Sequence, residues 1–367
     1  MPEQIKIILG TRPEAIKLAP VILKLKEDGF NLFVIHTGQH SDLADDVLEY
    51  FGIEPDLRLK PDRSGTSEAS LLQSLISIID PVISAEDTAM VIVQGDTSTA
   101  LSGALTAHYQ KIPVAHLEAG LRSHDITQPF PEETNRKLIS HIADLHFVPT
   151  ASAKSNLLYE GVESDHIHMT GNSVVDALNM ILERSDSTNE QIRSKYADGF
   201  EKLLLLTTHR RENLGSPQNE IFKAVRQISE NHPGVKIVFP VHPNPAIKEH
   251  LQQLDGLLNV SLIKPLSYFE FVPLMAASDL ILTDSGGIQE EAPALGVPVL
   301  VLRNKTERPE LIEAGAGKLV GTEADKITDV TARYLKSSAT HTHREIFGDG
   351  NTSSRVSAII KEFLTDS

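Results

Sequence analysis

Two acidic motifs close together in the chain hold the residues best suited to proton-transfer chemistry. Glu118 follows an apolar, strand-like run, and Glu132 opens a helix-like run after a short loop. Two carboxylates brought to one place meet the requirement of general acid and base catalysis. The alternative interpretation is structural, because Glu132 and Arg136 have the i, i+4 spacing of an ion pair on a helix surface.

Asp96 is a third candidate carboxylate, placed shortly after a strand-like run at residues 90–93. This position suits a side chain that faces Glu118 and Glu132. It also suits the N-cap of a helix predicted over residues 97–108, because aspartate accepts hydrogen bonds from the first turn of a helix. The residue types alone leave both roles open.

A turn that contains two glycines, Ser285-Gly286-Gly287, lies between a strand-like run and a helix-like run at residues 289–295. Backbone N–H groups at the start of a helix bind anions, and glycines let a phosphate or diphosphate come close. Glu291, about one turn into the helix, is placed to reach ribose hydroxyl groups. The alternative is a simple turn in which Ser285 is the N-cap.

Cationic residues in other turns fit the same anionic ligand. Arg12 and Lys17 flank the first predicted strand–helix turn, and Arg308 lies in a later turn. Guanidinium groups bind phosphate oxygens in pairs. His209 ends an apolar strand next to further arginines, which favours contact with a departing phosphate or acid catalysis. Phe271 would either stack on a base or pack in the core.

Parallel sheets would bring these residues together. Apolar runs alternate with longer runs of helical period, which predicts two doubly wound α/β domains with helices on both faces of each sheet. Ligands bind beyond the carboxyl ends of the strands in such sheets. The predicted strands are residues 5–9, 32–36, 90–93, 114–116 and 145–148 in the first series, and 203–207, 236–240, 260–263, 280–283 and 297–302 in the second.

Composition excludes several classes of function. The 367 residues carry a net charge of −16, which argues against nucleic acid and anionic membranes as partners. Cysteine is absent, which excludes disulfides and thiol catalysis. No GxGxxG follows a predicted strand and no HExxH occurs, so neither NAD nor a metal is expected as a cofactor. Without a signal-like start or an apolar run near ~20 residues, we expect a cytoplasmic protein.

Ten ordered motifs resemble those of the non-hydrolysing UDP-N-acetylglucosamine 2-epimerases of bacteria and archaea. They are GTRPEAIKLAP (10–20), TGQH (37–40), QGDT (94–97), HLEAGLRS (116–123), PFPEETNR (129–136), TGN (170–172), THRREN (208–213), PVHPNP (240–245), TDSGGIQEEAP (283–293) and LRNKTERPE (302–310). The resemblance implies a GT-B-like architecture: two Rossmann-like doubly wound parallel-sheet domains, the active site in the cleft between them, and a C-terminal helix that crosses back. The expected domains are residues 1–171 plus 350–367 and residues 172–349.

The resemblance also implies the reaction, a reversible inversion at C2 of UDP-GlcNAc that gives UDP-ManNAc without NAD. Elimination of UDP would give 2-acetamidoglucal, and re-addition after protonation of the opposite face would give the epimer. The implied catalytic residues are Asp96, Glu118, Glu132 and His209. The implied substrate-binding residues are Arg12, Lys17, Phe271, Ser285, Gly286, Gly287, Glu291 and Arg308.

Two further partners are implied by the resemblance. One is a second copy of the chain in a homodimer, and the other is a second UDP-GlcNAc that acts as an allosteric activator. The candidate allosteric ligands are Gln39, His40, Arg63, Arg210 and His242, with Glu132 shared between the two sites.

Other functions remain open from the residues. A hydrolysing epimerase would release ManNAc and UDP, and a related epimerase would act on a UDP-2,3-diacetamido sugar or a uronate. A GT-B glycosyltransferase would share the fold but require an acceptor. A protein that binds nucleotide sugars without turnover would have no use for three convergent carboxylates.

Overall fold

The computed structural model describes residues 4–39, 41–84, 86–242, 244–336 and 344–366. The chain forms two compact units, which we call unit 1 (Met1–Ala177 and Phe347–Ser367) and unit 2 (Leu178–Ile346). The first division falls inside helix α7 (Val174–Arg184), after the expected boundary at residues 171/172. The expected boundary lies at Gly171 and Asn172, which precede the helix, whereas the first turn of the helix still belongs to unit 1. The second division falls at residues 346/347, shortly before the expected 349/350.

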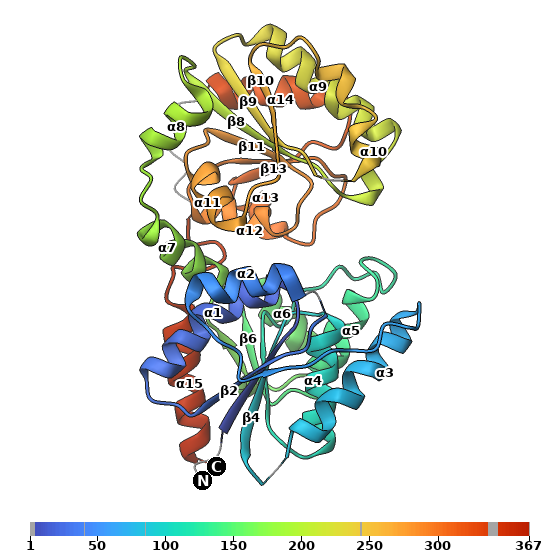
Figure 1. The fold of residues 1–367 in the computed structure, drawn as a ribbon, viewed down its shortest axis with the longest axis vertical. Helices are drawn as coiled ribbons and strands as arrows, with labels where there is room; N and C mark the ends of the chain where they lie inside the picture. The colour runs from blue at the N-terminus through green and yellow to red at the C-terminus, as the bar shows by residue number, and fades with distance from the viewer. Residues whose placement is uncertain (1–3, 40, 85, 243, 337–343, 367) are drawn as a thin grey trace. The chain divides into compact units, whose positions relative to one another are not determined.

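Unit 1 contains a parallel sheet of seven strands in the order β3-β2-β1-β4-β5-β6-β7 (Figure 1). The strands are β1 (Gln4–Leu9), β2 (Leu32–His36), β3 (Leu57–Arg58), β4 (Thr88–Gln94), β5 (Val114–Leu117), β6 (Leu145–Val148) and β7 (Ile167–Met169). The strands β3 and β7 were not predicted, because each is too short and too polar to stand out as an apolar run. The others lie where apolar runs predicted them.

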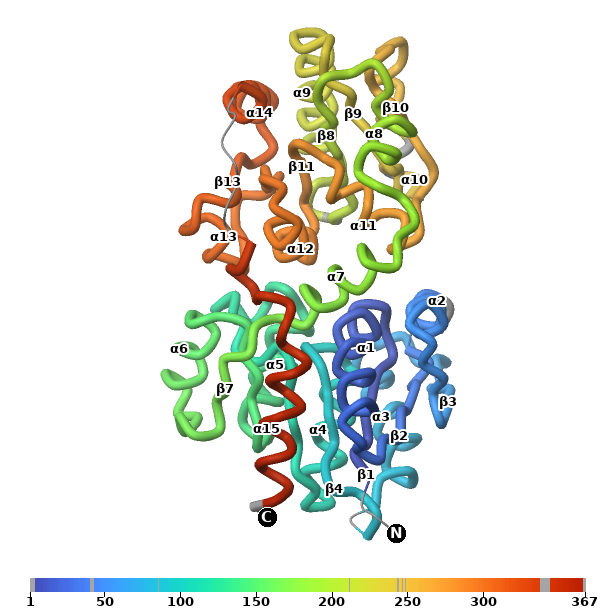
Figure 2. Tube along the Cα trace, turned by 90° about the vertical axis from the view of Figure 1, so that its left-hand side faces the viewer, coloured from blue at the N-terminus to red at the C-terminus, as the bar shows by residue number. Residues whose placement is uncertain are grey.

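Helices cover both faces of this sheet. In one layer α1 lies between α2 and α15, and in the other α4 lies between α3 and α5 (Figure 2). The helices of unit 1 are α1 (Arg12–Glu27), α2 (Ser41–Phe51), α3 (Glu68–Ile79), α4 (Ser98–Tyr109), α5 (Glu132–Ser140), α6 (Ala151–Tyr159) and α15 (Thr352–Asp366), with 3-10 turns at Asp80–Val82 and Ser164–His166. The C-terminal helix α15 therefore returns to the first unit, as expected.

Two polar contacts fix α15 within unit 1. Asp176 of α7 accepts hydrogen bonds from the backbone N of Thr352 (3.2 Å) and of Ser353 (2.8 Å), so it satisfies the first N–H groups of the helix. Further along, the Ser357 hydroxyl donates to Asp28 at the end of α1. The start of α15 is thus held by the segment through which the chain leaves unit 1.

Unit 2 contains a parallel sheet of six strands in the order β10-β9-β8-β11-β12-β13. The strands are β8 (Lys202–Thr207), β9 (Val235–Pro240), β10 (Val260–Ile263), β11 (Leu280–Thr283), β12 (Val299–Val301) and β13 (Gly317–Leu319). The helices are α8 (Asn189–Ala197), α9 (Ser216–Asn231), α10 (Pro245–Lys248), α11 (Tyr268–Ala276), α12 (Ile288–Ala294), α13 (Pro309–Glu313) and α14 (Ala324–Lys336), with 3-10 turns at Arg211–Asn213 and Leu251–Leu254.

Each sheet has its own apolar core. In unit 1, Ile8, Val91 and Val93 are fully buried against the helices, and in unit 2 Leu204 and Phe239 are buried in the same way. Burial of one such side chain contributes roughly 1.5–3 kcal/mol. Two separate cores make each sheet edge a rigid support for the turns that follow its strands.

Candidate active site

The turn between β4 and α4, residues 95–97, joins two of the predicted carboxylates to the helix that the third one opens. Asp96 belongs to the turn itself. Glu118 lies against it, since a Cβ atom built on Gly95 would lie 3.5 Å from Oε2 of Glu118. Helix α5, which Glu132 opens, reaches the turn through Arg136, whose Nε lies 3.0 Å from the Asp96 carboxylate. Unit 1 therefore places Asp96, Glu118 and the helix that Glu132 opens at the carboxyl edge of its sheet.

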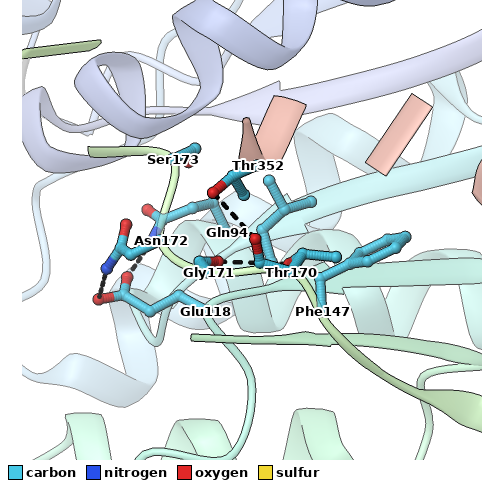
Figure 3. A pocket seen from close by; sticks show the side chains of 9 residues that line it. Gln94, Glu118, Phe147, Thr170, Gly171, Asn172, Ser173 and Thr352 are labelled. Carbon is cyan, nitrogen blue, oxygen red and sulfur yellow. Dashed lines mark hydrogen bonds between the residues drawn. The ribbon is translucent and has the colours of Figure 1, made fainter. Parts of the chain in front are cut away.

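Three donors hold the carboxylate of Glu118, and Figure 3 shows two of them, Gln94 and Asn172. Oε1 accepts hydrogen bonds from Nζ of Lys17 (2.5 Å) and Nδ2 of Asn172 (3.4 Å), and Oε2 accepts one from the amide of Gln94. The Glu118 side chain is only 8% exposed, so its ion pair with Lys17 is weakly screened by solvent. Because an ionised carboxylate is a pure acceptor, it suits a site where every partner donates.

The backbone of Glu118 adopts an unusual conformation. Its φ angle is 60°, in the left-handed region that residues other than glycine rarely occupy. Gly120 follows with a φ of 84°, and a Cβ atom there would lie 2.3 Å from the carbonyl oxygen of Ala153. Such a conformation costs of order 1–3 kcal/mol and persists where the surroundings enforce it, often at functional sites. The chain thus turns sharply after β5, at the residue that carries the carboxylate.

Asp96 is bound to a buried guanidinium group. Arg136 donates to its carboxylate through both Nε and Nη2, and Asn135 donates to its backbone carbonyl (2.8 Å). The predicted N-cap role of Asp96 is wrong. Helix α4 begins one residue later than predicted, and its N-cap is Thr97, whose hydroxyl accepts from the backbone N of Ala100.

Glu132 differs from the other two acids. The i, i+4 ion pair that the sequence suggested is wrong, because among the described residues Arg136 pairs with Asp96 and Glu133 instead. Oε2 of Glu132 is buried and has no hydrogen-bond partner within the described part of the chain. A buried polar oxygen without a partner is costly, and a ligand with a donor group would satisfy it.

Two buried glutamates that organise this edge were missed by the sequence analysis. Glu133 is fully buried, and its Oε2 accepts from the backbone N of Ser123 (3.0 Å) and from Arg136 (3.2 Å), so it ties the loop after β5 to α5. The signal was available in the Glu-Glu pair at the start of α5, with Arg136 spaced i, i+3 from the second acid.

Glu14 is the other buried glutamate, and it joins the first βα turn to the β4–α4 turn. Its carboxylate accepts from the backbone N of Gly10 (2.9 Å) and of Thr11 (2.7 Å), and from the Thr97 hydroxyl (2.6 Å). Burial raises its pKa to about 7, although these hydrogen bonds oppose the rise. The signal for this role was the Thr11-x-x-Glu14 capping-box spacing at the start of α1.

The two cations predicted at the first turn have different surroundings. Arg12 is the first residue of α1, and its side chain is exposed. Lys17 is half-buried, and its ammonium group lies on Glu118. Unit 1 thus places Lys17 with a carboxylate, whereas the sequence suggested a phosphate partner.

Two guanidinium groups lie beside the predicted anion turn of unit 2. A Cβ atom built on Gly286 would lie 3.2 Å from Nη2 of Arg210 and 3.4 Å from Nη1 of Arg308. Nε of Arg210 is buried and has no hydrogen-bond partner in the described chain. The sequence assigned Arg308 to the substrate and Arg210 to an allosteric site, whereas the structure brings both to one glycine. Two guanidinium groups at a bare backbone turn suit a diphosphate.

The N-cap role suggested for Ser285 is wrong, because α12 begins after Gly287, which is the N-cap. The backbone N of Ser285 instead donates to the Thr283 hydroxyl (3.0 Å). Its carbonyl oxygen accepts from the side-chain amide of Gln289 (3.1 Å). Residues 283–289 therefore form a turn whose own polar groups keep it in shape.

Carboxylates position Arg308 beside this turn. Its Nε donates to Glu290 (2.7 Å), and its Nη1 lies 3.4 Å from Glu307. Burial raises the pKa of Glu307, but Arg303 and Arg308 outweigh it and lower this pKa to about 2. Glu307 therefore stays ionised at neutral pH and holds the two arginines in place.

Asp284 organises the loop that carries His209 and Arg210, and the sequence analysis did not single it out. It is fully buried and accepts from the Thr208 hydroxyl (2.9 Å), the backbone N of His209 and Arg210 (3.1 Å each) and Nδ2 of Asn213 (2.9 Å). Nδ1 of His209 lies 3.5 Å from the same carboxylate. The available signal was an aspartate that ends a wholly apolar strand.

Helix α11 supplies a partner for Glu291. The Tyr268 hydroxyl donates to Oε1 of Glu291 (3.0 Å), and Glu291 itself is largely buried. Phe271, one turn after Tyr268 on the same helix, is half-buried. Tyr268 was not predicted as a site residue. Its i, i+3 spacing from Phe271 indicated that the two side chains share one face of a helix.

The predicted allosteric ligands fall into two groups. In unit 1, Gln39 accepts from the backbone N and the hydroxyl of Thr99 (3.1 and 2.7 Å), and Arg63 donates to the carbonyl oxygen of Gln39. In unit 2, the His242 ring stacks on that of His209 with 5.8 Å between centroids. His40 lies outside the described residues.

The described residues contain no group of three or more His, Cys, Asp or Glu side chains that could hold a metal ion. No helix among them is long and apolar enough to cross a membrane.

Comparison with known proteins gives consistent matches. Residues 23–361 match the family model of UDP-N-acetylglucosamine 2-epimerases. The UDP-N-acetylglucosamine 2-epimerase of Escherichia coli K12 is 42% identical over 365 residues, which cover 96% of this chain and 97% of the relative. The UDP-GlcNAc 2-epimerase of Neisseria meningitidis, solved bound to UDP-GlcNAc, has a TM-score of 0.88 at 40% identity and full coverage of both chains. A Listeria monocytogenes structure of the same description has a TM-score of 0.90 at 40% identity, covering 100% of this chain and 98% of that one. These matches confirm the expected two-domain, Rossmann-like fold of GT-B type.

Proposed function

The chain belongs to the UDP-N-acetylglucosamine 2-epimerase family, and we propose that it interconverts UDP-GlcNAc and UDP-ManNAc without net hydrolysis. The observation that carries the proposal is that Asp96, Glu118 and the helix α5, which Glu132 opens, meet at the β4–α4 turn of unit 1. The binding of UDP-GlcNAc by the Neisseria meningitidis relative supports the same substrate here.

The reaction begins with departure of UDP. The C2 hydrogen is not next to a carbonyl group, so a carboxylate alone does not remove it. As the bond between C1 and the diphosphate oxygen breaks, positive charge develops on the sugar and acidifies that hydrogen. A carboxylate takes the proton, the C2–H electron pair forms the C1–C2 double bond, and 2-acetamidoglucal and UDP result.

The second half reverses these steps on the other face of the sugar. An acid protonates C2 from the opposite side, and a diphosphate oxygen of UDP adds back to C1. General acid and base groups contribute roughly 10²–10⁴-fold each. We assign Glu118 as the base for one face, because its site suits an ionised carboxylate. Glu132 and Asp96 are the candidates for the other face.

Unit 2 holds UDP in this proposal. Arg210, Arg308 and the Gly286-Gly287 turn stabilise the diphosphate as it gains charge, with His209 close to the leaving oxygen. Glu291 binds the ribose, and Phe271 lies against the uracil. Arg12 contributes from unit 1. The product would supply the synthesis of polysaccharides that contain ManNAc.

Product analysis tests the proposal. Purified protein incubated with UDP-GlcNAc and no acceptor should form UDP-ManNAc, as followed by NMR. Incubation with pure UDP-ManNAc should lead to the same equilibrium mixture of the two UDP-sugars. Release of free ManNAc with UDP would identify a hydrolysing enzyme instead. A requirement for an acceptor would identify a glycosyltransferase.

Activation by a second UDP-GlcNAc and assembly as a homodimer also remain proposals. If Gln39, Arg63 and His242 bind an activator, the rate should depend sigmoidally on UDP-GlcNAc, and UDP-ManNAc alone should react slowly. A hyperbolic curve would contradict activation. Sedimentation at micromolar concentration should give the mass of two chains.

A further inference from the structure

The chain crosses between the units twice, and the two crossing segments contact each other within unit 1. We call the contact between residues 170–173 and residues 347–352 the clamp. The chain leaves unit 1 after Ala177 and returns at Phe347. The backbone N of Asn172 donates to the carbonyl oxygen of Phe347 (2.6 Å). Gly171 has a φ of 90°, and a Cβ atom there would lie 2.9 Å from Cα of Gly348. The approach is so close that it requires glycine at position 171.

Helix α15 anchors this clamp. The Thr352 hydroxyl donates to the carbonyl oxygen of Thr170 (3.1 Å), and Asp176 receives the first N–H groups of the helix. The segment of residues 170–173 is therefore held in place by hydrogen bonds to Phe347 and Thr352, where the chain returns to unit 1.

The same segment contacts both members of the Lys17–Glu118 ion pair, and Figure 3 shows its contact with Glu118. Nδ2 of Asn172 donates to Oε1 of Glu118 (3.4 Å), and the Ser173 hydroxyl donates to the carbonyl oxygen of Lys17 (2.6 Å). The orientation of the Asn172 amide is not arbitrary. Its Oδ1 accepts from the backbone N of Val174 (3.0 Å), so the NH₂ group must face Glu118.

We propose that Asn172 is a positioning residue for Glu118, which links the carboxylate to the clamped chain crossings. Asn172 is only 3% exposed, so water competes little with its amide for a hydrogen bond to the Glu118 carboxylate. A displacement of either crossing would move the Asn172 donor relative to Glu118. Its effect on turnover rests on the proposed function, whereas the contact itself can be tested by stability alone.

The substitution Asn172→Asp isolates the contact. It keeps an oxygen that accepts from Val174, and it replaces the donor that faces Glu118 by a like charge. The thermal midpoint should fall by several degrees in the wild-type background and by less than half as much in Glu118→Gln, where no repulsion arises. The matched control is Asn156→Asp, since Asn156 is half-buried in unit 1 and donates to the carbonyl of Gly120. It should lower the midpoint equally in both backgrounds.

Kinetics provide the second readout, with Asn172→Ala, which adds no charge. The value of kcat should fall at least tenfold while KM changes less than about threefold. A kcat within twofold of wild type, or equal midpoint shifts for Asn172→Asp in both backgrounds, would overturn the proposal. If the wild-type protein does not epimerise UDP-GlcNAc, only the proposed function fails, and the midpoints still decide the contact.

Discussion

Units 1 and 2 have the same kind of parallel sheet, but Glu118 and Asp96, which follow strands of unit 1, have other partners than Asp284, which follows a strand of unit 2. In unit 1, Glu118 and Asp96 each have a cationic partner, Lys17 or Arg136. In unit 2, Asp284 binds backbone N–H groups and neutral side chains, and two guanidinium groups lie at the bare backbone of Gly286. The topology is therefore compatible with either chemistry. The difference lies in the partners of these three acids: Glu118 and Asp96 bind cations, whereas Asp284 holds the loop that follows β8.

The largest expected effect comes from an acid of unit 1. Glu118→Gln should lower kcat by roughly 10²–10⁴-fold, because the amide cannot accept the C2 proton. The dissociation constant of UDP, measured by calorimetry, should change less than about threefold. If Glu118→Gln lowered turnover and UDP affinity by the same factor, the assignment of proton transfer to unit 1 and of UDP binding to unit 2 would be contradicted.

The next largest effect comes from the cations of unit 2. Arg308→Ala should weaken UDP binding by roughly 10–100-fold, since hydrogen bonds to charged groups contribute about 1.5–3 kcal/mol. The matched control is Arg226→Ala, which removes bonds to the carbonyl of Gln253 in the same unit. The control should leave the calorimetric UDP affinity unchanged, and an equal loss in both variants would refute the assignment.

Acid stability provides a third comparison, because two deeply buried histidines lie in unit 1. Burial lowers the pKa of His116 to about 4 and that of His146 to about 3. Between these values and 6.5, the unfolded chain binds protons that the folded chain does not. The free energy of unfolding should therefore fall as pH falls from about 6.5 toward 4, by about 1.4 kcal/mol per unit of pKa shift. Glu14 acts in the opposite direction, because its raised pKa lowers the free energy of unfolding as pH rises from 4.5 to about 7. The contribution of this one carboxyl group is smaller than that of the two histidines.

Urea unfolding at pH 7.5 and pH 5 checks this prediction. His146→Asn should reduce the difference in unfolding free energy between the two pH values. His141→Asn, at an exposed position of the same unit, should leave that difference unchanged. A difference that is the same in wild type and His146→Asn would show that the buried histidine does not control acid stability.

The smallest effect is expected at the glycine of unit 2. Gly286→Ala would place a methyl group against the flexible ends of Arg210 and Arg308 at 3.2 and 3.4 Å. UDP affinity should fall about three- to tenfold, with a thermal midpoint close to wild type, because the displaced atoms are side-chain ends. A lower midpoint with unchanged affinity would mean that this glycine serves the fold rather than the ligand.

The fold was predictable because continuous apolar runs alternate with helical periodicity, and the candidate acids were predictable because they follow strands. Partners were less predictable. Arg136 lies one helical turn from Glu132 but bonds Asp96, far away in the sequence. Lys17 likewise bonds Glu118, which lies 101 residues away in the sequence. Local spacing reports which side chains share a helix face, whereas the choice of partner depends on which turns the sheet brings together.

The missed residues follow the same rule. Glu133, Glu14 and Asp284 are buried acids that each accept a hydrogen bond from at least one backbone N–H group. Nothing in their residue type separates them from exposed acids. Their role arises from burial, which only the assembled sheet supplies.

Solvent deuterium incorporation tests the central claim most directly, namely that the acids of unit 1 exchange the C2 proton while UDP leaves. Wild-type protein in D₂O with UDP-GlcNAc should give UDP-ManNAc with deuterium at C2, and Glu118→Gln should incorporate it at least a hundredfold more slowly. Epimerisation with retention of the original hydrogen at C2 would contradict the elimination mechanism and the role of these acids.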